Sequence, residues 1–117
     1  MRFSSLLFML LAFNSIYVFA DACRKDVTAH PDMVGCMRSY LSESEGLLEE
    51  LIKDKRSSYE IPEGYYESQR ESIHERCMIY AGLGGQRSEV FELQCELDEA
   101  RRLIDLLHSY MRASDAN

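Results

Sequence analysis

The stretch that decides the fold is SEVFELQCELDEARRLIDLLHSYMR, residues 88–112. Its apolar residues recur at alternating steps of three and four, which places them on one stripe of a helix: Val90, Leu93, Leu97, Ala100, Ile104, Leu107 and Met111. Ser88 is a typical N-cap residue, and Arg112 suits the last turn because a cation there opposes the negative end of the helix dipole. The sequence therefore predicts a helix over 88–112.

Cys95 lies away from this stripe, on the side of the predicted helix that also carries Phe91 and Leu106. A helix with apolar residues on a second side has a neighbour on that side too, at least along its first half. We therefore expect 88–112 to be the central helix of a bundle.

Two further helices are predicted upstream. Gly82, Gly84 and Gly85 are expected to interrupt helical structure before residue 88. The helix that precedes them is expected to begin near Pro62 and to end near Ala81. Its shared face carries Tyr66, Ile73, Cys77 and Tyr80.

The earlier stripe contains Met33, Met37, Tyr40, Leu47, Leu48, Leu51 and Ile52. It predicts either one helix over about 32–55 or two helices joined near Ser42, because Ser42-x-x-Glu45 matches a capping box. Residues 27–29 are expected to form a short helical turn, and 56–65 a loop. No alternation typical of strands occurs, so the fold is predicted to be all-α: a small disulfide-stapled bundle of three long helices plus a short N-terminal helical piece.

Residues 1–20 have the features of a cleaved secretory signal. Arg2 is followed by the apolar run LLFMLLAF, and Val18 and Ala20 supply small residues before a cut between Ala20 and Asp21. A second cut, after Ala20-Asp21-Ala22 and before Cys23, also fits the small-residue rule. A membrane anchor is the weaker alternative, because Asn14 and Ser15 interrupt an apolar run that is already short for a bilayer. The expected organisation is a signal peptide at 1–20 and one secreted domain at 21–117.

Charge and size exclude several classes of function. The net charge of the whole chain is −7, and removal of Arg2 with the signal makes it −8. A chain this acidic lacks the basic excess that binds nucleic acid, so no nucleic-acid partner is expected. No membrane span is expected in 21–117.

The four cysteines, Cys23, Cys36, Cys77 and Cys95, all follow the predicted cut. An even number in a short exported domain predicts two disulfides, and the absence of a Cys-x-x-Cys pair argues against a metal site. Four cysteines allow three connectivities. Cys77 with Cys95 and Cys23 with Cys36 is favoured, because a turn at 82–85 brings the first pair to similar heights on antiparallel helices. The two crossed patterns together remain as strong.

No motif indicates catalysis. His74-Glu75 begins like a zinc-protease helix, but Met78 stands where the second histidine is needed. The glycines at 82–85 lack the strand and the spacing of a dinucleotide-binding loop. We expect no enzyme activity, no catalytic residues, no cofactor and no metal.

The loop and the start of the following helix gather aromatic residues among acidic ones. Tyr59, Ile61, Tyr65 and Tyr66 lie among Glu60, Glu63 and Glu67. Aromatic residues are enriched in the centres of protein interfaces, and an acidic surround favours a basic partner. These four residues are a candidate partner-binding surface; the alternative is that they cover a small core.

The spacing of Cys36, Cys77 and Cys95 loosely resembles that of insect odorant-binding proteins, including salivary relatives in biting flies. That family is secreted, acidic and all-helical, and the resemblance implies a carrier of a small apolar ligand. Tyr40 replaces the second cysteine of the usual Cys-x-x-x-Cys, and little chain precedes Cys23.

Two functions are therefore predicted. The first is a secreted, extracellular, toxin-like effector of the venom or salivary kind, or a hormone-like ligand, which binds an extracellular protein target or receptor. The alternative is an extracellular carrier of a small hydrophobic ligand in a cavity lined by Met33, Met37, Met78 and Met111.

Overall fold

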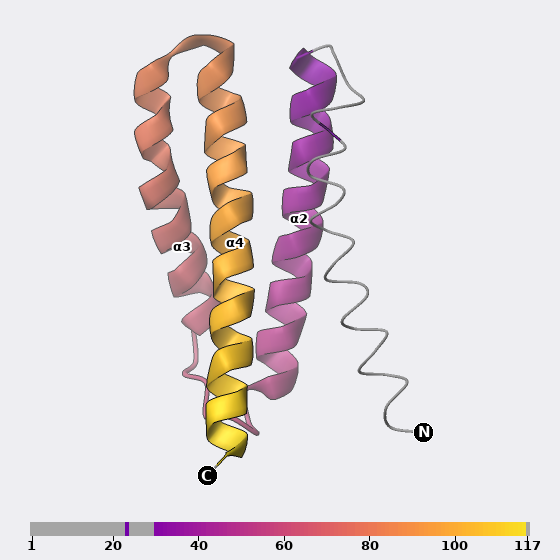
Figure 1. Ribbon diagram of the computed structural model, residues 1–117, viewed down its shortest axis with the longest axis vertical. Coiled ribbons are helices and arrows are strands. Elements are labelled where there is room, and N and C mark those ends of the chain that lie inside the picture. The colour runs from indigo at the N-terminus through magenta and orange to yellow at the C-terminus, as the bar shows by residue number, and fades with distance from the viewer. Residues whose placement is uncertain (1–22, 24–29, 117) are drawn as a thin grey trace.

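The described part of the chain forms three long helices, which lie side by side (Figure 1). The computed structural model describes Cys23 and residues 30–116. Its elements are α2 (His30–Lys55), α3 (Tyr65–Cys77), a 3₁₀ helix η1 (Met78–Leu83) and α4 (Gly85–Asp115). The all-α prediction is confirmed. The predicted signal at 1–20 and the helical turn at 27–29 lie outside the described residues.

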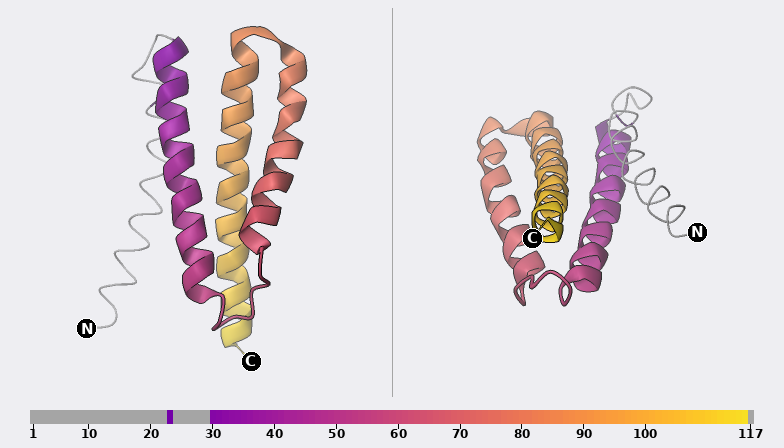
Figure 2. Two further views of the ribbon diagram at one scale, coloured as in Figure 1. Left: turned by 180° about the vertical axis from the view of Figure 1, so that it is seen from behind. Right: turned by 60° about the horizontal axis from the view of Figure 1, so that its bottom comes forward.

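The central helix is α4, as predicted, but on its second side only Cys95 packs against the core, whereas Phe91 and Leu106 are exposed. Both views in Figure 2 show it between α2 and α3, which pack along it and touch each other far less. Its 31 residues would measure about 46 Å, close to the 49 Å longest dimension of the structure. It buries Leu93, Leu97, Ala100, Ile104 and Leu107 from the predicted stripe, and Leu103 beside it.

The predicted start of α4 was wrong. The helix begins at Gly85, directly after Gly84, whereas Ser88 lies inside the first turn. Gly84 and Gly85 have φ angles of 66° and 67°, which L side chains rarely adopt, and this is why the chain turns there.

α2 is one continuous helix, so the capping-box interpretation of Ser42 was wrong. Ser42 is exposed in the middle of the helix. The hydroxyl of the buried Ser44 donates a hydrogen bond of 2.8 Å to the carbonyl of Tyr40 one turn earlier, a bond that serine makes inside helices. α2 packs against α4 through Met37, Leu48, Leu51 and Ile52 of the predicted stripe and through Val34, which lies outside it.

α3 is shorter than predicted at both ends. It begins at Tyr65, because Gly64 in the left-handed region (φ 75°) separates it from Pro62. It ends at Cys77, and the predicted end at Ala81 falls within η1. Only Ile73 and Cys77 of α3 are buried.

Two disulfides hold the bundle together. Cys23 pairs with Cys36 and Cys77 with Cys95, at Cα–Cα distances of 5.8 and 5.6 Å, so the favoured connectivity is the one that the structure shows. Each disulfide belongs to one of two core clusters, the first around Leu48 and Ile104 and the second around Met37 and Leu97. Disulfides of this kind indicate an oxidising compartment.

Among the residues that the structure describes, no helix combines the length and the apolar character that crossing a bilayer requires.

Candidate functional site

A groove of about 730 Å³ runs between α2 and α3, with α4 as its floor. It exists because α2 and α3 both pack on α4 and hardly on each other. Its floor and lower walls are apolar: Leu48, Ile73, Leu93, Ala100 and Leu103. We call this site the α2–α3 groove.

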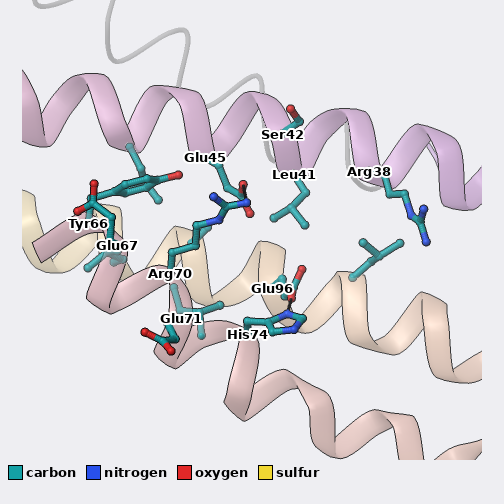
Figure 3. A pocket seen from close by; sticks show the side chains of 15 residues that line it. Arg38, Leu41, Ser42, Glu45, Tyr66, Glu67, Arg70, Glu71, His74 and Glu96 are labelled. Carbon is teal, nitrogen blue, oxygen red and sulfur yellow. Dashed lines mark hydrogen bonds and ion pairs between the residues drawn. The ribbon is translucent and has the colours of Figure 1, made fainter. Parts of the chain in front are cut away.

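Charged side chains from all three helices stand over this apolar floor (Figure 3). Arg70 of α3 reaches Glu45 of α2, with 3.3 Å between guanidinium nitrogen and carboxylate oxygen. His74 of α3 contacts Glu96 of α4, with 2.8 Å from Nδ1 to Oε1. The Glu45–Arg70 pair is the ion pair that joins α2 to α3 in the described part of the chain.

The carboxylates dominate the electrostatics of the groove. Burial raises the pKa of Glu45 and the negative charge of Glu96 raises it further, while Arg70 opposes the shift. The pKa of Tyr66 is also raised, first by burial and then by the charge of Glu45. An added positive charge in the groove would therefore be stabilised.

The histidine in the groove supplies a pH-dependent contact. The hydrogen bond and charge of Glu96 raise the pKa of His74 above its ordinary value of 6.5. Because this pKa is raised in the folded state, the stabilisation from the contact between His74 and Glu96 is fully present below pH 6.5. This stabilisation is lost as the pH rises through the folded-state pKa of His74.

We expect Glu96→Gln to lower the pKa of His74 toward the ordinary value. The measurement is an NMR titration of the imidazole proton, with His74→Gln as the assignment control. The melting temperatures of wild type and His74→Gln should differ most just below pH 6.5 and converge at alkaline pH. A gap that widens as the pH rises would contradict the assigned contact.

Three of the four residues of the predicted partner-binding surface, Ile61, Tyr65 and Tyr66, line one pocket beside the loop, and Tyr59 is not among its lining residues. Ile61 is buried in the first core cluster, and Tyr59, Tyr65 and Tyr66 pack against that cluster. The hydroxyl of Tyr59 donates to the carboxylate of Asp115 at 3.1 Å, which ties the loop to the end of α4. Tyr66 lines the α2–α3 groove. Their role in binding a partner remains a prediction.

A second exposed feature lies at the end of the α3–α4 hairpin. Met78, Ile79 and Leu83 of η1 are exposed, Ile79 by 78%, and Tyr80 stacks on Phe91 with ring centroids 5.9 Å apart.

The residues described by the structure contain no group of three or more side chains arranged to hold a metal ion.

Comparison with known proteins assigns this fold to a family. The sequence model of the family described as Antitoxin TsiV3 matches residues 27–116. The chain belongs to the TsiV3 antitoxin family. It is also similar to the antitoxin protein TsiV3 of Vibrio cholerae serotype O1, with 30% identity over 111 residues that cover 95% of this chain and 91% of the relative.

Membership of the TsiV3 family overturns both predicted functions. Membership of an antitoxin family contradicts the prediction of a toxin-like effector or hormone-like ligand, and it also contradicts the prediction of a small-ligand carrier. Small size, a predicted export signal, paired cysteines and missing catalytic motifs are common to exported binding domains of many kinds. They do not distinguish a toxin from the protein that counteracts it.

The methionines of this TsiV3-family protein show why the carrier prediction was wrong. Met37 belongs to the second core cluster and Met33 packs against it, whereas Met111 packs against the first. Met78 is half exposed. They therefore fill or flank separate parts of the molecule and do not surround one cavity.

The sequence does not indicate most of the charged residues of the α2–α3 groove. Arg38, Arg70 and Glu96 belong to no sequence motif, and His74 belongs only to a fragment of a zinc-binding motif. The spacing of Glu67 and Glu71 at one helical turn could have indicated an acidic face of α3. The pairs across the groove join residues 22 or more positions apart, which periodicity does not reveal.

Proposed function

We propose that this chain is an antitoxin that binds a toxin protein directly and blocks it by occupying its surface, without catalysis. The observation that carries the proposal is the family membership over residues 27–116. The structure supports it in a second way, because a bundle tied by two disulfides presents a preformed surface and so limits the ordering cost of association.

The proposed compartment is the bacterial periplasm. The two disulfides require an oxidising space, and the periplasm is such a space in the bacteria from which the Vibrio relative comes. The export features of residues 1–20 fit this location, with cleavage between Ala20 and Asp21 as the expected processing step.

The test is capture followed by reconstitution of toxicity. The full chain, tagged at its C-terminus, is cross-linked in its own cells, and each captured protein is then expressed alone in a neutral host. We expect one of them to stop growth when it is exported, and co-expression of the full chain to restore growth.

The matched control is the same chain without residues 2–20, which should stay in the cytoplasm and fail to protect against an exported toxin. If no captured protein is toxic by itself, or if the chain does not restore growth, the antitoxin proposal is wrong. Protection by the truncated chain would contradict the periplasmic location alone.

A further inference from the structure

The α2–α3 groove combines an apolar floor with charged side chains at its rim, and a single side chain of a ligand can contact both. Its floor is apolar, formed by side chains such as Leu48, Leu93 and Leu103. Its charged lining groups are Arg38, Arg70, Glu45, Glu67, Glu71 and Glu96, together with His74. Two cations against four carboxylates leave a net charge of −2 when His74 is neutral and −1 when it is protonated.

The carboxylates of the groove differ in how far they are already neutralised. Glu45 is paired with Arg70, and Glu96 contacts His74. Among the described residues, no ion pair involves Glu67 or Glu71, although both line the groove and both are exposed. A cation that enters the groove therefore finds two carboxylates whose charge no neighbouring cation has taken up.

The dimensions of the groove suit a short peptide segment. Its α2 wall runs from Arg38 to Leu48, which corresponds to about 15 Å of helix axis. A lysine or arginine has an aliphatic stem that packs on apolar surface and a charged head that stays at the rim. That shape matches a floor of leucines beneath a rim of carboxylates.

We propose that the α2–α3 groove is the docking site for a basic segment of the toxin, in which a lysine or arginine flanked by apolar residues packs on the apolar floor beside the Glu45–Arg70 pair, with its cationic head against Glu67 and Glu71. This inference rests on the proposed antitoxin function and specifies the partner chemistry. Charge complementarity between an acidic groove and a basic segment also accelerates association.

The test begins with a probe that needs no toxin. The probe is a fluorescent 15-residue helical peptide of leucine, alanine and lysine, and its counterpart has glutamate at every lysine position. Binding is measured by fluorescence anisotropy to the oxidised chain 21–117 with both disulfides intact. We expect the lysine peptide to bind and the glutamate peptide to bind at least ten-fold more weakly.

Charge reversal then locates the site. The double variant Glu67→Lys/Glu71→Lys should bind the lysine peptide at least ten-fold more weakly than wild type. The matched control is Glu50→Lys/Glu75→Lys, which makes the same charge change at exposed positions of α2 and α3 outside the groove lining. It should change binding less than three-fold, and circular dichroism should show both variants folded. Equal losses in the two double variants would mean that net charge alone binds the peptide, and would overturn the proposal.

The same variants are then tested on the toxin identified by the capture experiment. The groove variant should lose at least ten-fold in toxin affinity, and a photo-cross-linker at Leu41 on the groove wall should label a toxin peptide that contains lysine or arginine.

The proposal would be wrong if the toxin were labelled from a cross-linker at Ile79 on η1 but not from Leu41, and if the groove variant kept full toxin affinity. The interface would then lie at the apolar end of the α3–α4 hairpin. Either result leaves the antitoxin function standing, because wild type would still bind the toxin. The antitoxin function fails only if wild type binds no toxin.

Discussion

Replacement of both Cys77 and Cys95 by alanine is expected to lower the free energy of unfolding by about 3 kcal/mol. The two residues are 18 positions apart, and a cross-link that closes a loop of this length removes chain entropy from the unfolded state by about that amount. Domains of this kind are stable by only about 5–15 kcal/mol, so the loss is a large part of the total.

The disulfide between Cys77 and Cys95 matters most for α3. This helix has 13 residues and buries only Ile73 and Cys77. Isolated helices of about this length are marginal in water, so its position depends on the covalent link to α4 and on ion pairs such as His74 with Glu96. We expect amide hydrogen exchange in the double variant to increase more in α3 than in α2.

Urea unfolding followed by circular dichroism provides the measurement. The control is Cys23→Ala/Cys36→Ala, whose loop of similar length predicts a similar loss of stability but whose disulfide does not touch α3. Wild type reduced with dithiothreitol should lose at least as much stability as either variant. A loss below about 1 kcal/mol in the Cys77 and Cys95 variant would contradict the assigned role of this disulfide.

Ile104→Ala is expected to destabilise the protein by about 2–5 kcal/mol. Ile104 is 6% exposed, lies on the buried stripe of α4 and belongs to the first core cluster. Its truncation removes buried methyl and methylene groups and leaves a cavity that the surrounding helices can only partly close. The residue does not line the α2–α3 groove, so the effect should be on stability and not on the groove.

The matched control is the same substitution at Ile79, which is 78% exposed on η1. Ile79→Ala should change the free energy of unfolding by less than about 0.5 kcal/mol. Urea unfolding of the two variants provides the comparison. Similar losses at both positions would show that burial in this bundle does not determine the cost of truncation.

The sequence predicted the helix at 88–112 and its central position because local periodicity reports how many sides of a helix are buried. It predicted the favoured disulfide pairing from the turn at 82–85, which sets two helices antiparallel. It predicted the boundaries of α3 and the course of α2 less well. Pro62 and the Ser42-x-x-Glu45 pattern carry the signals of helix starts, whereas Gly64 and the burial of Ser44 decide where the helices begin and continue.

By itself, then, the sequence determined that this protein is an acidic helical bundle held together by two disulfides, because apolar spacing and cysteine number are local properties of the chain. Only the tertiary structure decided that α2 and α3 separate over α4 and leave a groove between them. The same packing of the three helices places Glu45 next to Arg70 and His74 next to Glu96. These contacts depend on how three helices rotate against one another, and that rotation is fixed by side-chain packing across the bundle.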